Sequence, residues 1–412
     1  MPIELPSPVS DRDLPSPPNV FIWLALLVVF LAAGAAWTLF SWPRDIPSGG
    51  SPWFWMQLLG YPFLAWCFVF GFRLHRYDEA RNYWAARERV RQQDHEDAVA
   101  FGSEPLAVLG VAYSCAMASD GVAGRIAQEE SALQACAPAA GMPVTRHTRL
   151  DLPEDEGSTD RLQTAFQVLL EKLDAAVRAL PARVPFDVRL HLPDDVDPLR
   201  VLGVWARCWD GRGLRSAEAA IVTGAEGLMT LESWLDIPGG PALEKVSLFI
   251  AVQLHDTPPE NSAEAAVALL LGWAPVAHRH DLTPLAMLHR PVACEAEGVS
   301  GAIADASLYA CGKPADLHQL WHSGLNKADK VALLKGGSGV ELGAAQKDGL
   351  PGVHDIDAAL GYPGVAASWF AVALAIEHAG QNSDPQLIAC REGAMRLAVV
   401  RPVAHQGETE TS

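Results

Sequence analysis

Two histidines four residues apart, His318 and His322, have the spacing of metal ligands on one face of a helix. Asp316 lies close by in the sequence, where a carboxylate could complete a ligand set or orient an imidazole. The segment lacks the glutamate of the zinc motif H-E-x-x-H. A second cluster of potential ligands falls where we expect a loop: His278, His280 and Asp281. Exposed polar side chains account for both patterns, so we expect no metal ion and no cofactor.

The glycine-rich segment at residues 335–339, with the sequence KGGSG, resembles a phosphate-binding loop. In such loops the lysine follows the glycines and opens a helix, whereas here it precedes them, so we expect a surface turn. The sequence contains no G-x-S-x-G motif, and hydrolase chemistry of that kind therefore has no support.

Seven cysteines are spread along the chain without any C-x-x-C pair, at positions 67, 115, 136, 208, 294, 311 and 390. An odd number of scattered cysteines is typical of a reducing cytoplasm and excludes the familiar zinc cages. Any one of them could act as a nucleophile, but isolated cysteines usually pack as small apolar side chains. The residue types and their spacing therefore assign no catalytic residue.

The composition is that of a folded, acidic protein. The chain has 412 residues, of which 50% are hydrophobic and 19% are charged, and its formal net charge is -18. Disordered chains contain fewer apolar residues. The negative charge argues against a nucleic-acid partner, because phosphates select basic surfaces.

Two uncharged apolar runs, at residues 20–40 and 53–72, dominate the N-terminal region. Each is close to the ~20 residues that a helix needs to cross a bilayer, and a short loop with flanking tryptophans joins them. We expect a transmembrane helical hairpin; the alternative is two buried helices of a soluble core. Because arginines cluster within residues 73–91, the positive-inside rule places the N-terminal tail and the C-terminal region in the cytoplasm.

These features divide the chain into five expected regions. They are a disordered Pro-rich tail (1–19), the transmembrane helical hairpin (20–72), an Arg-rich helical stalk (73–97), a cytoplasmic α/β region (98–404) and a disordered tail (405–412). The length of the α/β region leaves open a division into two lobes near residue 240.

Periodic apolar residues predict the elements of the α/β region. Strands are expected at residues 106–113, 186–192, 219–222, 246–254 and 265–273, the last of which could also be helical. Helices are expected at residues 160–180, 300–311, 314–325 and 365–378, and glycines 336, 337 and 339 mark a loop. A terminal β-hairpin is expected to turn around Gly393. Strands that alternate with helices predict a layered α/β fold.

The C-terminal part resembles the end of a thiolase or ketoacyl-synthase domain. The residues that prompt this are HDID at 354–357, GYPGVAAS at 361–368, the Ala-rich helix and the hairpin after it. In that family a Gly-His pair opens the helix and supplies a catalytic histidine; here the matching position is Tyr362, which we expect to fill the former active-site volume. Residues 262–271 resemble the strand that closes the first half. Because no matching nucleophilic cysteine or second histidine motif is present, the resemblance implies the layered fold without its catalytic set.

Nearly the whole chain also resembles a family of proteobacterial proteins built from a transmembrane hairpin, an Arg-rich stalk and a cytoplasmic α/β region. The hairpin, the segment VQLHD at 252–256, the segment SAEAAVALLL at 262–271 and the closing segment carry this resemblance. Members resemble adaptors encoded beside lipase effectors of type VI secretion systems. The resemblance implies two partners, a secreted lipase effector and the secretion spike protein.

The sequence thus supports two functions of different classes. The first is a membrane-anchored cytoplasmic adaptor or chaperone, which binds a lipase-type effector and assists its loading for export. The alternative is a membrane-bound acyl transferase of thiolase-like fold with an unrecognised active site. A thiolate near a histidine in a pocket would favour the enzyme, and a large exposed apolar surface would favour the adaptor.

Overall fold

The protein is described by a computed structural model over residues 15–43, 51–137, 144–150, 152, 158–222 and 226–403. Two compact units can be separated, one ending at Ala98 and the other beginning at Val99. Residues 1–14 of the expected N-terminal tail and all of the expected tail at 405–412 lie outside the described residues.

The N-terminal unit is a helical hairpin made of α1 (Val20–Ser41), α2 (Pro52–Trp55), the π-helix η2 (Met56–Gly60) and α3 (Tyr61–Gly102). Gly34 packs so closely against Pro62 that a side chain at residue 34 would overlap the proline ring. Near the other end of α1, Trp66 Nε1 donates to the backbone oxygen of Trp23 at 2.9 Å, and Trp23 contacts Phe70 edge to face. The α1 helix and the helical segment 52–102 are both long and apolar enough to cross a membrane, with mean hydropathies of 2.5 and 1.3.

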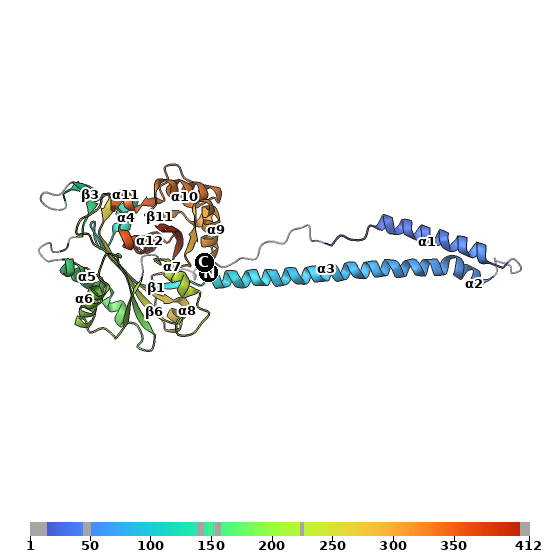
Figure 1. Cartoon of the computed structure of the whole chain (residues 1–412), viewed down its shortest axis with the longest axis horizontal. Coiled ribbons are helices and arrows are strands. Elements are labelled where there is room, and N and C mark those ends of the chain that lie inside the picture. Colours follow the sequence, from blue (N-terminus) through green and yellow to red (C-terminus); the bar gives the residue numbers. More distant parts are fainter. Residues whose placement is uncertain are drawn as a thin grey trace, which may run out of the picture. The chain divides into compact units, whose positions relative to one another are not determined.

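The C-terminal unit is built on one mixed sheet with the strand order β12-β11-β13-β14-β9-β1-β8-β6-β4-β5 (Figure 1). Its first half contains β1 (Leu106–Cys115), β4 (Phe186–His191), β5 (Glu218–Val222), β6 (Val246–Gln253) and β8 (Ala265–Trp273). Its second half contains β9 (Ala286–Leu288), β11 (Gln319–Ser323), β12 (Val353–Asp355), β13 (Gln386–Glu392) and β14 (Ala394–Pro402).

The two halves repeat one topology. In the first half β5, β4 and β6 are parallel and β8 is antiparallel to β6 and β1. In the second half β12, β11 and β13 are parallel and β14 is antiparallel to β13 and β9. The halves join where β1 pairs antiparallel with β9. The boundary of the repeat therefore falls between β8 and β9, while a division into lobes near residue 240 stays a prediction.

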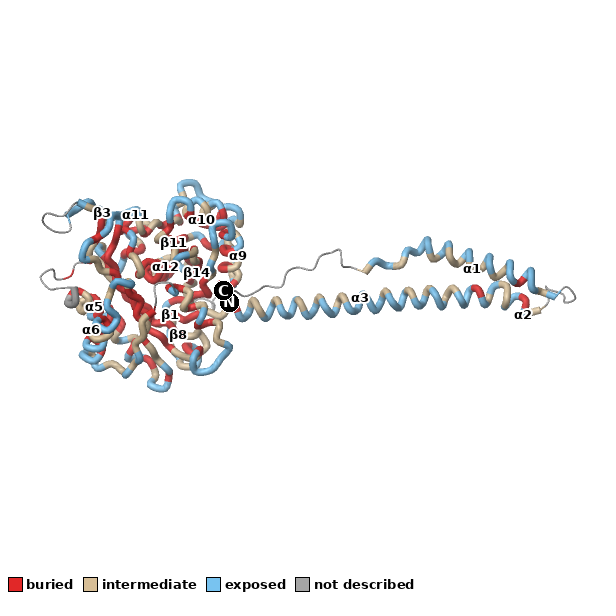
Figure 2. The backbone as a smooth tube through the Cα atoms, in the orientation of Figure 1, coloured by how far each residue is buried: buried red, intermediate tan, exposed pale blue. Residues whose placement is uncertain are grey.

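Helices cover both faces of each half. The outer helices are α5 (Ser158–Arg178) and α6 (Pro198–Gly211) on the first half, and α9 (Val299–Tyr309) and α10 (Lys327–Gly339) on the second. Between the halves lies α12 (Ala367–Asn382), with α4 (Val122–Ala127) and α7 (Met229–Leu235) in the same core. Along β6, Leu248 and Ile250 face the outer helices, whereas Phe249 and Ala251 face α12. The buried residues accordingly concentrate around the sheet and α12 (Figure 2).

The remaining elements are short. A second sheet has the order β2-β3-β7, with β2 at Gln134–Cys136, β3 at Thr145–Thr148 and β7 at Ser262–Ala263. The others are α8 (Ala274–Arg279), β10 (Val292–Cys294), η3 (Ala296–Gly298), η4 (Pro314–Asp316), η5 (Gly343–Ala345), α11 (Ile356–Leu360) and η6 (Gly364–Ala366).

Most of the elements expected in the α/β region are confirmed, including the five strands, the α5 helix and the terminal hairpin with Gly393 at φ +75°. Residues 265–273, for which the sequence allowed either a strand or a helix, form the strand β8, because they pair with a neighbouring strand on each side. The expected helix at 314–325 is wrong. That segment forms η4 and then β11, which is paired on both edges, and these ladder bonds outweigh the local helix preference of its residues.

The expected loop at glycines 336, 337 and 339 is also wrong, because these residues belong to α10. A Cβ atom added at Gly336 would lie 2.9 Å from Val299 Cγ1, so the glycine allows α10 to approach α9 closely. The KGGSG segment is therefore a packing surface of a helix. It is neither a surface turn nor a phosphate-binding loop.

Candidate functional site

The ends of the parallel strands in the two halves line a common cavity. His191 is the last residue of β4, Gln253 the last of β6 and Glu392 the last of β13. In α/β sheets, ligands usually bind at the carboxyl ends of the strands. The cavity, which we call the carboxyl-end cavity, measures about 610 Å³ and is lined by His191, Pro193, Asp194, Gln253, Tyr362, Gly364, Val365, Ala367, Arg391, Glu392, Gly393, Ala394 and Arg396.

His191 presents a hydrogen-bond donor to this cavity. Its side chain is 97% buried (3% exposed), and Nδ1 accepts a hydrogen bond of 2.8 Å from Trp369 Nε1 on α12. The proton of the neutral imidazole is therefore on Nε2, which has no protein partner. Burial lowers the pKa of His191 to about 4. At neutral pH the residue is thus an uncharged N–H donor with an unused hydrogen bond.

The carboxylate of Glu392 accepts hydrogen bonds at the beginnings of two helices, α7 and α12. Its carboxylate accepts a hydrogen bond of 2.9 Å from the backbone N–H of Leu228, which precedes α7, and another from Ser368 Oγ in the first turn of α12. A side chain at Gly227, where φ is +43°, would overlap this carboxylate. Burial raises the pKa of Glu392. Beside it, Arg396 has a buried Nε without a hydrogen-bond partner.

Tyr362 lies in the wall of the cavity and is 41% exposed, so the expectation that its ring fills a buried volume is wrong. The reason lies in its backbone, which bonds to the β7 segment: its N–H donates to the oxygen of Asn261, and its oxygen accepts from Ala263 N–H. Those bonds hold the residue at the rim. Burial, followed by the nearby charges of Asp357, raises the pKa of Tyr362, so the phenol stays protonated at neutral pH.

The cavity offers donors and acceptors for binding, but its lining contains no thiol. The nearest candidate in sequence, Cys390, is 1% exposed, and burial raises its pKa well above the ordinary value. The thiol therefore stays protonated and out of reach of a ligand. The arrangement can bind a carbonyl or anionic group through His191 and Arg396. Among the described residues that line this cavity, no thiol lies next to a base.

The histidines singled out by spacing do not assemble into a site. His322 is buried on β11, where burial lowers its pKa to about 4, whereas His318 precedes the strand and is exposed. Asp316 accepts a hydrogen bond from the backbone N–H of Lys313. In the second cluster, His278 lies in the last turn of α8 and His280 follows it. Within the described residues, no three His, Cys, Asp or Glu side chains are placed to hold a metal ion.

The sequence did not point to His191, Glu392 or Arg396. His191 is distant in the chain from Glu392 and Arg396, which lie in the terminal hairpin, and His191 and Glu392 each end an apolar strand. A weak signal exists for His191, since the segment Pro193-Asp194 follows one residue after it, as expected where a strand ends.

A second concave surface lies between α9 and α10, on the outer face of the second half. This groove, which we call the α9–α10 groove, measures about 1020 Å³ and is lined by Ala296, Glu297, Val299, Ser300, Lys327, Ala328, Val331, Ala332, Lys335, Gly336 and Gly339. Ala328, Val331, Ala332 and Lys335 recur at helical spacing, so one exposed stripe of α10 faces the groove. Val331, in the middle of this stripe, is 59% exposed.

No protein-family model and no curated protein matches the sequence. Solved structures match the chain in fold. The ketosynthase from module 6 of the bacillaene synthase of Bacillus subtilis 168 superposes with a TM-score of 0.55 at 12% identity, over 74% of this chain and 71% of that chain. An oxazolomycin ketosynthase domain from Streptomyces albus superposes with a TM-score of 0.53 at 12% identity, over 75% of this chain and 76% of that chain. The α/β region has a thiolase-like ketosynthase fold. Identities this low show the fold alone.

The buried imidazole makes a testable difference to acid stability. Because the pKa of His191 is about 4 in the folded protein against 6.5 for an ordinary histidine, the unfolded chain is protonated first as the pH falls. The corresponding stability is complete above pH ~6.5 and is lost as the pH falls toward ~4. In His191→Asn the amide oxygen can still accept from Trp369, but residue 191 no longer titrates. The variant should therefore lose less free energy of unfolding between these pH values, by about 3 kcal/mol at most.

Urea denaturation of the full-length protein in detergent, followed by tryptophan fluorescence at pH 7 and pH 4.5, measures this difference. The same loss of stability in the wild type and in His191→Asn would show that His191 titrates normally.

Proposed function

We propose that this protein is a membrane-anchored cytoplasmic adaptor that binds a lipase-type effector of a type VI secretion system and assists its loading onto the secretion spike. The family resemblance of the whole chain names this partner. The α9–α10 groove is the observation that carries the proposal, because adaptors need an exposed apolar surface and this one is open on the outer face of the globular unit.

The chemistry of the groove suits a helix of the effector. Its floor is made of small side chains, mainly alanines and glycines, which permit close approach of another backbone. Lys327 and Lys335 are exposed on the lining turns of α10, and Val331 lies between them. An amphipathic effector helix would place its apolar stripe on Val331 and acidic residues near the two lysines.

The carboxyl-end cavity is consistent with binding rather than catalysis. At the position where the thiolase resemblance expects a catalytic histidine, Tyr362 remains a protonated phenol, and such a group is a poor general base at neutral pH. Cys390 is buried beneath the cavity. A fold used by acyl-transfer enzymes can in this way serve a binding function.

A charge in the groove tests the adaptor function. Val331→Glu should weaken binding to a purified lipase-type effector from the same genome at least ~10-fold, since a charged side chain would replace the apolar contact at residue 331 and would repel the acidic residues of the effector helix. Leu199→Glu is the matched control, because Leu199 on α6 is 80% exposed and lies outside the groove. Calorimetry with the full-length adaptor measures both affinities. Equal affinities for the wild type and Val331→Glu would remove the groove from the proposal.

The second candidate function is a membrane-bound acyl transferase of thiolase-like fold. The ketosynthase fold and the neutral N–H of His191 in the cavity support it, because such a donor can stabilise an oxyanion. We expect the purified full-length protein to show no turnover of acyl thioesters, and Tyr362→Phe to leave effector secretion unchanged. Turnover above background that Tyr362→Phe or His191→Asn abolishes would favour the enzyme over the adaptor.

The membrane orientation is part of the proposal. The arginines within residues 73–91 follow the second apolar segment and favour the cytoplasmic side of a bacterial inner membrane. Reporter enzymes that are active in the cytoplasm should therefore work when fused after residue 100 or at the C-terminus. Activity of a periplasm-dependent reporter at either point would contradict both the orientation and the adaptor function.

A further inference from the structure

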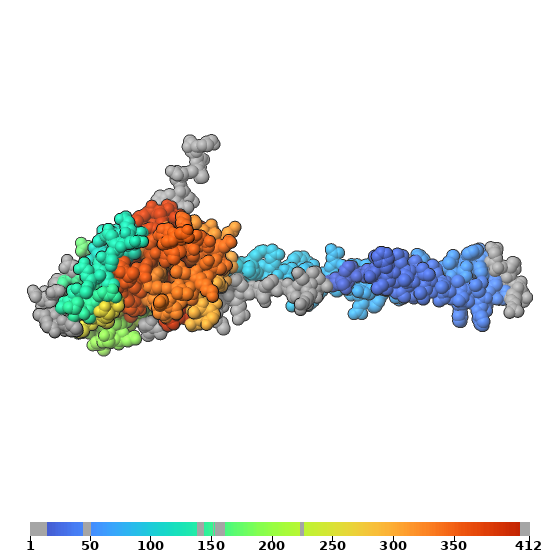
Figure 3. Space-filling view, turned by 90° about the horizontal axis from the view of Figure 1, so that it is seen from above, coloured from blue at the N-terminus to red at the C-terminus, as the bar shows by residue number. Residues whose placement is uncertain are grey.

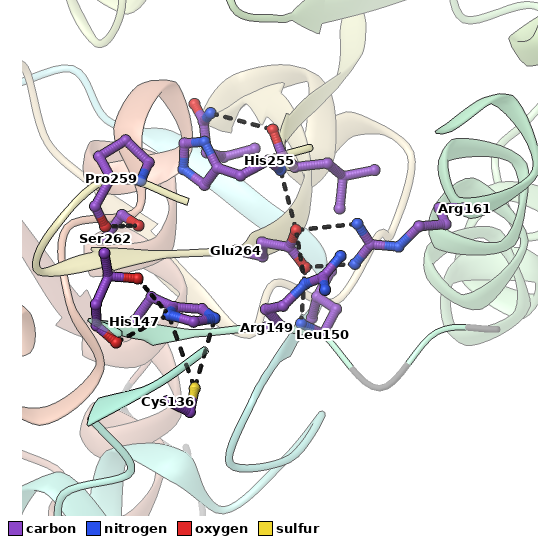
Figure 4. Close-up of polar contacts among 12 residues, drawn as sticks. Cys136, His147, Arg149, Leu150, Arg161, His255, Pro259, Ser262 and Glu264 are labelled. Carbon is purple, nitrogen blue, oxygen red and sulfur yellow. Dashed lines mark hydrogen bonds and ion pairs between the residues drawn. The ribbon is translucent and has the colours of Figure 1, made fainter. Parts of the chain in front are cut away.

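The small sheet places a thiol beside an imidazole, and neither side chain belongs to the lining of the two concave surfaces described above. Strands β2 and β3 pair antiparallel with Cys136 opposite Thr145, and His147 lies two residues further along β3 on the same face. Cys136 Sγ is 3.6 Å from His147 Nε2 and 3.8 Å from Nδ1 (Figure 4). The contact therefore follows from the register of the sheet.

The imidazole is held in the tautomer that can accept a proton from this thiol. His147 is 3% exposed, and its Nδ1 lies 3.2 Å from the backbone oxygen and 3.1 Å from Oγ1 of Thr145. A carbonyl oxygen can only accept a hydrogen bond, which assigns the ring proton to Nδ1. Nε2 is then the unprotonated ring nitrogen, and it lies 3.6 Å from Cys136 Sγ. A thiol next to an oriented imidazole is the arrangement that activates cysteine nucleophiles.

The other cysteines of the C-terminal unit differ from Cys136 in their surroundings. Burial raises the pKa of the thiol in Cys115, Cys208, Cys294 and Cys390. For Cys294 the raised pKa is about 11. Cys136 and Cys311 are exposed, and in the described part of the chain Cys311 has no contact with a histidine. In Figure 3 the α4 to β3 segment, in teal, forms surface beside the orange and red C-terminal half. Cys311 is thus a natural reference for an exposed thiol without a base.

The ionisable neighbours of the pair are themselves paired. Two carboxylates are bound by arginines: Glu260 by Arg146, and Glu264 by Arg161 and Arg149 at 2.5 Å and 3.8 Å (Figure 4). Burial lowers the pKa of His255, which therefore adds no charge at neutral pH. Compensated carboxylates do not oppose formation of a thiolate as free ones would.

We propose that Cys136 is a modification site that undergoes thiol–disulfide exchange with small disulfides of the glutathione type. His147 Nε2 takes the proton from Sγ, and the thiolate attacks one sulfur of the disulfide. A new S–S bond forms as the old one breaks, and the leaving thiolate takes the proton from the imidazolium. The exchange consumes one disulfide and releases one thiol. This site is independent of the adaptor function.

Mixed-disulfide formation on the full-length protein in detergent tests the proposal. The protein is incubated with oxidised glutathione at pH 7, and mass spectrometry of the cysteine peptides follows the modification of Cys136 and Cys311. Cys136 should react about tenfold faster than Cys311, as expected for a thiol whose deprotonation is assisted. In His147→Gln, Cys136 should slow to the rate of Cys311, while Cys311 itself is unchanged.

The pH dependence of the reaction rates distinguishes activation of the Cys136 thiol by His147 from a structural effect of the substitution. In the wild type, lowering the pH below ~8 should slow the reaction at Cys136 less than the reaction at Cys311, because an imidazole beside Cys136 can accept the proton of its thiol. This comparison needs no variant, so it holds even if His147→Gln fails to fold. Equal rates and parallel profiles at the two cysteines would overturn the proposal.

Discussion

The helix α12 is apolar around its whole circumference, and the globular unit depends on covering it. From Ala367 to Ile376 each of its side chains is buried, with Trp369 and Phe370 among the largest. Burial of a large apolar side chain contributes roughly 1.5–3 kcal/mol. The strands of one half of the sheet can cover only one side of such a helix. The two halves of the molecule cover both sides: Phe249 of the first half stacks on Trp369, and strands of the second half contact the same helix.

The same helix organises the carboxyl-end cavity. Trp369 donates to His191 from the core, and Ser368 donates to Glu392 one residue earlier. The polar groups of the cavity are therefore anchored to the part of the molecule that is least free to move. This explains how His191 is kept neutral with one nitrogen unused, because its other nitrogen is fixed by a buried tryptophan.

Burial also determines which thiols can react. In the core, the cysteines are surrounded by apolar atoms, which favour the neutral thiol and raise its pKa. Cys136 lies in the small sheet and is exposed. Exposure also distinguishes residues along α10. Gly336 packs closely on α9, whereas Val331 on the outer face is exposed. The proposed binding surface and the proposed reactive thiol both lie at the periphery, around a core that has the fold of ketosynthases.

The sequence by itself determined the elements whose signal is local. Apolar runs predicted the two hydrophobic helices, and periodicity predicted α5, β1, β4, β6 and the final hairpin, because the spacing of side chains follows directly from helix and strand geometry. The C-terminal motifs indicated the thiolase-like fold. Tertiary structure alone decided that residues 319–323 form a strand, since their hydrogen bonds go to β12 and β13. It also decided the site: the bond between His191 and Trp369 joins residues 178 positions apart, and no local pattern encodes a contact over that distance.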